Sequence, residues 1–173
     1  SRLCPLLNKF VLLILEVLKP QHLRLLSHFY LALLIFLAYY IYPQLLGNKD
    51  WEKCFDNALK ALWLDFGGLS TIDKKSPLFA PAHTGEYEKS YHNGDSWFWV
   101  NNLAAISLLK INKNKFKFNI SKILSASTEE ILWEGVIGAH SELSSAEKLT
   151  SEGCLNQAWS NAMFVELIHQ LFG

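Results

Sequence analysis

A long segment without charge near the amino end constrains the fold most. No formally charged side chain occurs between Arg24 and Lys49, and residues 25–46 are dominated by leucine, isoleucine, phenylalanine and tyrosine. A segment of this length could span a bilayer, or it could form a helix buried on all sides within a helical protein. Hydropathy does not separate the two cases. We favour a soluble protein with a buried helix, because Pro43 and Gln44 fit a loop leading into a site; a membrane segment over residues 25–46 is the alternative.

The remainder of the chain has the periodicity of helices. Asn48 is expected to cap a helix that ends at Gly67–Gly68, and a long loop follows over residues 69–93. One face of that first helix is apolar: Trp51, Cys54, Phe55, Ala58, Leu59, Leu62 and Trp63. Further helices are expected at about 96–111, 113–126, a short stretch opened by a capping box at 127–130, and 155–171. Because no segment has a convincing strand pattern, we predict an all-α fold with its chemistry on loops at one end.

Length and composition exclude several classes of protein. The 173 residues suit one domain over residues 1–173, and 16 basic and 16 acidic side chains leave no basic surface for nucleic acid. The three cysteines, Cys4, Cys54 and Cys154, form no CxxC pair, which favours a reducing, cytoplasmic location. The six histidines show no HxxxH or HExxH spacing, so we expect no metal site.

The most informative motif for function is the nonapeptide at residues 91–99, Tyr-His-Asn-Gly-Asp-Ser-Trp-Phe-Trp. Flat aromatic rings beside hydrogen-bonding groups suit a sugar, whose C–H faces stack on rings and whose hydroxyls need polar partners. His92, Asp95, Trp97 and Trp99 are therefore candidate sugar contacts. His92 could equally be a structural histidine, and Asp95 could be a helix cap or a catalytic carboxylate. On a helix the two tryptophans would point to different sides, so one could pack in the core.

Two later segments complete the candidate site. Glu142 lies in a loop of small residues, His-Ser-Glu-Leu-Ser-Ser at 140–145, which favours a working carboxylate over a solvated helix face. Gln157 and Trp159 form a second pair of an amide and an indole. Hydrolysis of a glycosidic bond uses two carboxyl groups, and Glu142 is the best candidate for one of them.

These motifs resemble a known family. Residues 91–102 are similar to the tyrosine–histidine–x–glycine–x–x–tryptophan segment of glycogen debranching enzymes, and more narrowly of the prokaryotic amylo-α-1,6-glucosidase domain. Residues 67–73 resemble its glycine–leucine–x–threonine turn, and residues 139–143 its serine–glutamate segment. Residues 152–160 resemble its glycine–cysteine–x–x–glutamine–alanine–tryptophan–serine signature. The four motifs occur in the family's order, and the resemblance covers about residues 43–173.

The resemblance implies an (α/α)6 barrel, of which this chain would be the C-terminal half. It implies inverting hydrolysis of α-1,6-linked glucose in glycogen or limit dextrin, without a cofactor, and its catalytic base corresponds to Glu142. The family's acid lies in a tryptophan–methionine–aspartate segment that this chain does not contain, so the missing N-terminal half of the barrel is an expected partner. The alternatives are another α,α-barrel α-glucosidase, similar to glucoamylase or trehalase, and a glycan-binding module without catalysis.

Overall fold

The computed structural model describes residues 31–85 and 89–173, and within these ranges the chain is mostly helical. These two ranges contain five α-helices, a short 3-10 helix and two strands of two residues each. In chain order they are α3 (Leu31–Ile41), η1 (Pro43–Leu45), α4 (Asn48–Leu62), β1 (Ser96–Trp97), α5 (Phe98–Asn112), α6 (Lys117–Trp133), β2 (Leu143–Ser144) and α7 (Ala158–Phe172). The predicted all-α class is therefore confirmed for the described residues.

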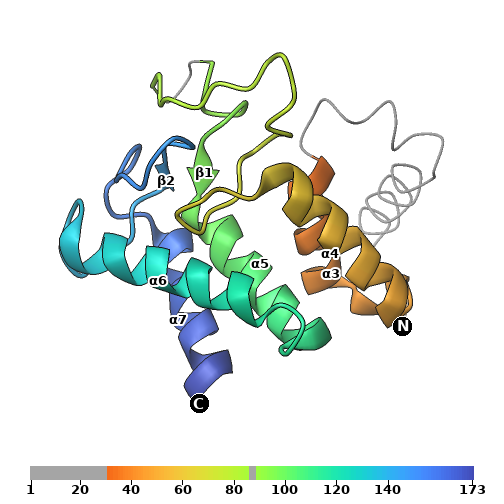
Figure 1. Cartoon of the computed structure of the whole chain (residues 1–173). Coiled ribbons are helices and arrows are strands. Elements are labelled where there is room, and N and C mark those ends of the chain that lie inside the picture. Colours follow the sequence, from red (N-terminus) through yellow and green to blue (C-terminus); the bar gives the residue numbers. More distant parts are fainter. Residues whose placement is uncertain (1–30, 86–88) are drawn as a thin grey trace, which may run out of the picture.

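Helix α5 is the centre of the arrangement, and it packs against α3, α4, α6 and α7. Figure 1 shows the two strands and the long connections at one end of these helices. The strands pair antiparallel, with Ser96 opposite Ser144 and Trp97 opposite Leu143. This pairing brings the segment before α5 against the segment between α6 and α7. The predicted placement of loops at one end of the helices is thereby confirmed.

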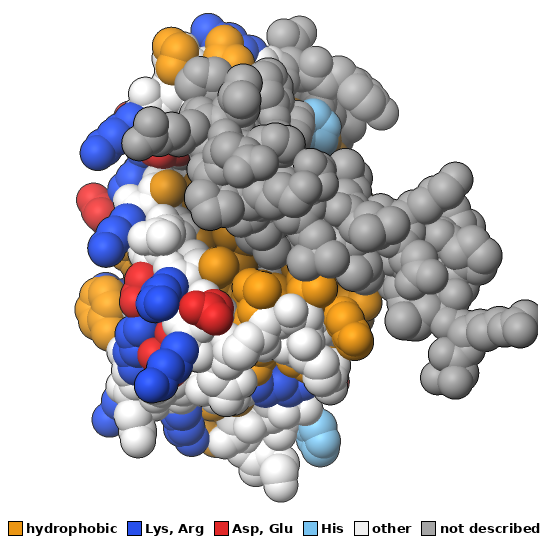
Figure 2. All heavy atoms as spheres, turned by 90° about the vertical axis from the view of Figure 1, so that its right-hand side faces the viewer, with side chains coloured by type: hydrophobic (Ala, Val, Ile, Leu, Met, Phe, Trp, Pro, Cys, Tyr) orange, Lys and Arg blue, Asp and Glu red, His pale blue; other side chains and the backbone are white. Residues whose placement is uncertain are grey.

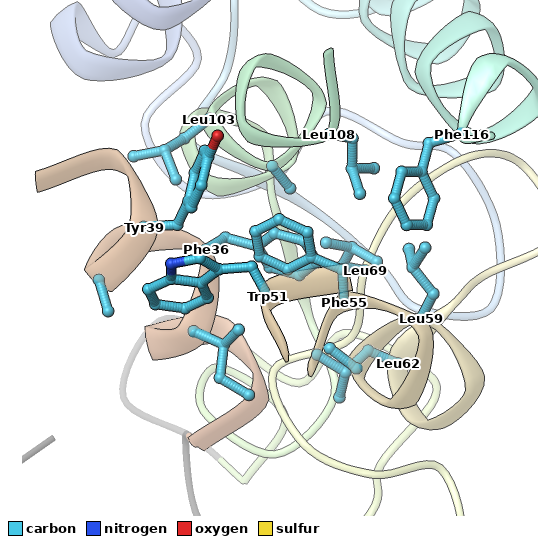
Figure 3. Close-up of a cluster of buried hydrophobic side chains, with 14 of the residues drawn as sticks. Phe36, Tyr39, Trp51, Phe55, Leu59, Leu62, Leu69, Leu103, Leu108 and Phe116 are labelled. Atoms are coloured by element: carbon cyan, nitrogen blue, oxygen red, sulfur yellow. The ribbon is translucent and has the colours of Figure 1, made fainter. Parts of the chain in front are cut away.

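Aromatic rings fill the core between α3, α4 and α5 (Figure 3). The ring of Phe55 stacks on Phe36 with centroids 4.9 Å apart, and it also meets the rings of Tyr39, Trp51 and Phe116. Phe36, Trp51 and Phe55 have no exposed surface. The apolar face predicted for α4 is the face that enters this core, and Cys54 and Trp63 lie half-buried at its edge.

The cap of helix α4 lies one residue earlier than predicted. The N-cap is Gly47, whose carbonyl accepts bonds from the N–H groups of Asp50 and Trp51, both at 3.0 Å. Asn48 is the first helical residue, so the prediction that it caps the helix is wrong. The helix ends at Leu62, before the turn that contains Gly67. Gly67 has φ +110°, and a Cβ there would lie 2.4 Å from the carbonyl oxygen of Lys122.

The capping box predicted at residues 127–130 does not open a separate helix. Helix α6 runs without a break through these residues to Trp133. Ser127 and Glu130 are both buried, and their side chains point to other elements instead of capping a helix end. Ser127 and Glu130, which have the spacing of a capping box, instead form a polar strip on the buried face of a continuous helix.

Charged groups are interspersed on the surface. Figure 2 shows acidic and basic side chains side by side along one edge of the molecule, with hydrophobic side chains between this edge and the centre of the view. Lys115 pairs with Glu52 at 3.1 Å and with Asp56 at 2.7 Å, which ties α4 to the turn between α5 and α6.

The uncharged segment at 25–46 lies only partly within the described residues. Its described part forms α3, which is 11 residues long, followed by η1. No helix within residues 31–85 and 89–173 combines the length and the apolar character needed to cross a bilayer. Ile35, Phe36, Ala38 and Tyr39 of α3 are buried against protein in the core. This part of the segment therefore behaves as a packed helix of a helical domain.

Candidate functional site

The nonapeptide forms a turn, a strand and the start of a helix. Residues 91–94 are a turn, Ser96 and Trp97 form β1, and α5 begins at Phe98. The helix predicted to begin at about residue 96 therefore begins two residues later, because Ser96 and Trp97 pair with β2. Trp97 is in a strand and Trp99 is in a helix, yet both are half-buried and both line one pocket, so the prediction that they point to different sides is wrong. The N–H of Phe98 donates to the carbonyl of Glu142 at 3.2 Å, which joins the nonapeptide directly to the glutamate segment.

The carboxylate of Glu142 is held by two donors from different segments. The Tyr91 hydroxyl donates to Oε1 at 2.7 Å, and the backbone N–H of Cys154 donates to Oε2 at 3.0 Å. Gly153 makes room for it: its φ is +68°, and a Cβ there would lie 2.6 Å from Oε2. The predicted catalytic carboxylate therefore has a defined position beside the nonapeptide, although Tyr91 and Cys154 are 51 and 12 residues away in sequence.

Rings of the nonapeptide form a compact aromatic group next to Glu142. His92 and Trp97 stack with centroids 5.9 Å apart and planes 11° apart, and Tyr91 meets Trp97 edge-on at 4.8 Å. The Trp97 indole N–H donates to the carbonyl of Tyr91 at 3.1 Å. His92 is exposed and Trp97 is half-buried. The arrangement gives a fixed aromatic wall, and the hydroxyl of Tyr91 connects this wall to the carboxylate.

A pocket of about 210 Å³ adjoins this wall. Its lining surface is almost entirely apolar, and the residues around it are Leu34, Leu37, Thr71, His92, Trp97, Trp99, Val100 and Leu103. An apolar pocket with few polar groups is the usual form of a small-molecule site, and sites for drug-sized ligands measure about 300–1,000 Å³. A smaller pocket suits a single ring. Among the described residues the buried indole N–H of Trp99 has no hydrogen-bond partner.

The second predicted pair, Gln157 and Trp159, lies at the start of α7. Trp159 meets Trp99 edge-on, with centroids 5.7 Å apart, and two-thirds of its surface is exposed. Gln157 is the N-cap residue of α7. Its N–H donates to the carbonyl of His140 at 2.9 Å, and its side-chain oxygen accepts a bond from Ser160 at 2.9 Å. Trp159 thus joins the aromatic wall through Trp99, whereas the side chain of Gln157 bonds within α7.

Asp95, the carboxylate of the nonapeptide, is buried among polar side chains. It has no exposed surface, and its Oδ2 bonds to Nδ1 of His83 at 2.7 Å and to the hydroxyl of Ser90 at 3.0 Å. Burial raises the pKa of Asp95, against the hydrogen bonds from His83 and Ser90, which lower it. Since α5 is capped at Trp97, Asp95 is not the helix cap either. In this arrangement its carboxyl group ties His83 and Ser90 to the segment just before β1.

Sequence reasoning missed the buried pair of Glu130 and His140. Nδ1 of His140 lies 2.5 Å from Oε2 of Glu130, and neither residue has exposed surface. The other carboxylate oxygen accepts bonds from the hydroxyls of Ser141 and Ser151, both at 2.6 Å. The signal that could have found Glu130 is its spacing, because it follows Ile123 by seven residues on the buried face of α6.

Protonation of Glu130 at low pH should lower the free energy of unfolding. Burial raises the pKa of this carboxyl, but the bonds from His140, Ser141 and Ser151 outweigh burial and hold the pKa below its ordinary value of 4.5. A lowered folded-state pKa contributes stability that is present above the unfolded pKa and is lost as the pH falls through the folded pKa. Urea unfolding at a series of pH values below about 5 measures the free energy of unfolding. As the pH falls, this free energy should decrease less steeply for Glu130→Gln than for the wild type. Glu129→Gln, on the exposed side of α6, should keep the wild-type slope; equal slopes for all three would contradict the assignment.

The fold and the site together describe a helical domain with an aromatic pocket and a carboxylate beside it, which is the class of a glycosidase-type domain. The family model for amylo-alpha-1,6-glucosidase matches residues 27–166. The chain therefore belongs to the amylo-α-1,6-glucosidase family, a family of glycosidase-type enzymes, as its motifs indicated. No curated protein sequence matches the chain significantly.

The family match extends further towards the amino end than the motifs did. The motifs place the start of the resemblance near residue 43, whereas the match begins at residue 27. It includes most of the uncharged segment at 25–46 and all of α3. This finding favours a helix of the family domain over a membrane anchor for the segment.

Proposed function

We propose that the pocket beside the aromatic wall binds a terminal glucose of an α-glucan, and that Glu142 is the base that activates water during hydrolysis of its α-1,6 linkage. The observation that supports this most is the bond from Tyr91 to Glu142. Through it, the carboxylate is fixed next to the rings of His92 and Trp97, which line the pocket. Glycogen and limit dextrin are the expected substrates, and the reaction needs no cofactor.

The roles of the wall follow from its geometry. A glucose ring is flat on its C–H faces, and the exposed faces of Trp97 and Trp159 are suited to stacking against it. His92 and Thr71 border the pocket, and the buried N–H of Trp99 lacks an acceptor that a sugar hydroxyl would supply. Gln157 would act as the N-cap residue of α7, and Asp95 would hold the segment before β1. Both residues would then stabilise the aromatic wall without contacting the sugar.

The mechanism that we propose is inverting. Glu142 would take a proton from water on one face of the sugar while an acid protonates the departing oxygen on the other face, which requires carboxyl groups about 6.5–9.5 Å apart. Asp95, which is buried against His83 and Ser90, is not placed to be that acid. We therefore propose that the acid comes from a part of the domain other than the described residues.

A further contact surface is proposed for that part of the domain. Along α7 only Ser160 and Leu167 are buried, whereas Val165 and Phe172 are 66% and 74% exposed. These two side chains are seven residues apart and therefore lie on one face of the helix. An apolar helix face of this kind is suited to packing against further helices, as in a complete α,α-barrel.

Binding of glucan through Trp97 can be tested by calorimetric titration with maltooligosaccharides and a limit dextrin. Trp97→Ala should weaken binding by about tenfold, which corresponds to roughly 1.4 kcal/mol, because an aromatic anchor often carries much of the binding energy. Trp133→Ala is the matched control, since Trp133 is 77% exposed at the far end of α6. Equal affinity of the Trp97 variant and the wild type would overturn the proposed pocket. Binding without any release of glucose would favour the alternative of a binding module.

A further inference from the structure

A buried polar network lies directly beneath the loop that carries Glu142. It begins in α6, where the hydroxyl of Ser127 lies 2.8 Å from Oδ1 of Asn102 in α5. Nδ2 of Asn102 lies 3.2 Å from Nε2 of His140, and Nδ1 of His140 lies 2.5 Å from Oε2 of Glu130. All four side chains are at least 98% buried. The network therefore links two helices to the first residues of the glutamate loop.

With the Asn102 amide oriented towards Ser127 through its oxygen, the donors and acceptors of this network run in one direction. Ser127 donates to the amide oxygen of Asn102, so the amide NH₂ faces His140 and donates to its Nε2. A neutral imidazole that accepts at Nε2 carries its proton on Nδ1, and this proton is donated to Glu130. Every donor thus points towards one carboxylate. The rings of Phe98 and Phe164 enclose the imidazole, with centroids 4.3 and 5.8 Å away.

The carboxylate of Glu130 holds both arms of the glutamate loop. Its Oε1 accepts bonds from the hydroxyl and the N–H of Ser141, the residue before Glu142, at 2.6 and 3.2 Å. The same oxygen accepts a bond at 2.6 Å from the hydroxyl of Ser151, on the returning arm that reaches Cys154. Glu142 bonds to Cys154 across these arms, with its own N–H donating to the carbonyl of Cys154 at 2.8 Å. Movement of either arm would therefore move the carboxylate of Glu142.

A buried polar network stabilises a loop only when all of its polar groups are hydrogen-bonded. A buried carboxylate costs several kcal/mol unless it is fully hydrogen-bonded, and a network that loses one member leaves the others unsatisfied. Glu130 meets this requirement with four hydrogen-bonding groups on its two oxygens. Directional bonds of this kind define a position more narrowly than apolar packing does, which suits a residue that must face a substrate.

We propose that Glu130 and His140 are positioning residues that hold Glu142 in its working place. This inference rests on the role proposed above for Glu142. Neither residue contacts the pocket; both act through the backbone of the loop. In the absence of the pair, the bond between Glu142 and the Cys154 N–H is lost or loosened, and the carboxylate no longer has a fixed position relative to Tyr91.

The variant Glu130→Gln tests the proposal because its effect on the network can be derived. Glutamine has one acceptor oxygen, and the N–H of Ser141 can only donate, so the oxygen must stay there. The amide NH₂ then faces Nδ1 of His140, which becomes an acceptor, and the proton moves to Nε2. Asn102 can turn its amide to accept that proton, and Ser127 can accept from Asn102. The network can therefore reverse without an unpaired group, and the variant is expected to fold.

Nitrogen-15 NMR of His140 reports the tautomer, and amide hydrogen exchange of Cys154 reports the position of Glu142. In the wild type we expect the Nδ1–H tautomer, with a proton at very low field. In Glu130→Gln we expect the Nε2–H tautomer, loss of the low-field signal and about a tenfold loss of exchange protection at Cys154. Glu129→Gln should match the wild type in all three. Where glucose release is measurable, the catalytic rate should fall about tenfold or more with little change in glucan affinity.

The proposal is overturned if His140 changes tautomer while protection of Cys154 and turnover remain at the wild-type level. The pair would then stabilise the interior only. Should Glu130→Gln fail to fold, Ser151→Ala removes a single bond at a half-buried position. It should give a smaller loss of protection at Cys154, and no loss would equally overturn the proposal. If the wild type binds no glucan, the proposed function fails, but the exchange experiment still decides whether the pair positions Glu142.

Discussion

Replacement of Glu142 with glutamine is expected to lower glucose release from a limit dextrin by a factor of roughly 10²–10⁴, the usual contribution of a general base. Glucan affinity should stay within about threefold, because the variant removes an interaction used only in the transition state. The amide fits the site. Its oxygen can accept from the Cys154 N–H, and its NH₂ can donate to the hydroxyl of Tyr91, which can act as an acceptor.

The measurement should use the complete domain that supplies the acid, assayed for glucose release and, by NMR, for the first anomer formed. An inverting wild-type enzyme releases β-glucose first from an α-linkage. Glu147→Gln is the control, since Glu147 is an exposed carboxylate five residues later in the same segment. Comparable turnover of the Glu142 variant and the wild type would remove Glu142 from the mechanism. Early release of α-glucose would contradict the inverting mechanism but would leave a catalytic role for Glu142.

Replacement of Phe55 with alanine is expected to destabilise the chain by about 3–5 kcal/mol, the range for removing a buried aromatic ring. Phe55 has no exposed surface and meets four other rings, from α3, α4 and the turn before α6. A cavity at this point would remove contacts from three elements at once, and these elements cannot all move inwards to close it. Because this is a large share of the stability of any domain, the variant could be unfolded without denaturant.

Urea unfolding followed by circular dichroism measures this loss. Asn57→Ala is the control, because Asn57 is exposed on the same helix and surface changes usually stay within about 0.5 kcal/mol. Phe55→Leu should lose less than Phe55→Ala, since it keeps most of the apolar volume. A loss below about 1.5 kcal/mol for the alanine variant would show that the aromatic cluster in Figure 3 is not the main core, given the usual cost of cavities.

The helices were predictable because their signal is local. The apolar side chains of α4 recur at 51, 55, 58, 59 and 62, and this spacing places them on one face whatever lies opposite. The break after α6 was predictable for a similar reason: Gly135 and Gly138 both have positive φ, at 44° and 86°, which glycine adopts most easily. The two strands were not predictable, because two residues are too few to show an alternating pattern.

The candidate site was predictable only in its residue types. A glutamate among small residues and a cluster of rings beside histidine indicated a carboxylate and an aromatic wall, and the family match supports that interpretation. The sequence did not reveal that Asp95 is buried, although it stands within the nonapeptide, or that Glu130 lies beneath the loop of Glu142. Folding brings the side-chain partners of both carboxylates near them, so the local sequence does not show these partners. The serine–glutamate pattern at 127–130 is compatible with a helix cap and with a buried polar strip.

Helix positions, apolar faces and family could be derived from the order of residues, because periodicity, glycine positions and motifs act over a few residues. Which polar groups meet depends on the packed fold. The bond from Tyr91 to Glu142 joins residues 51 positions apart, and the pairing of Ser96 with Ser144 is what brings their segments together. A hydrogen bond depends on distance and direction within a few tenths of an ångström, and packing of α5 against its neighbours sets those distances.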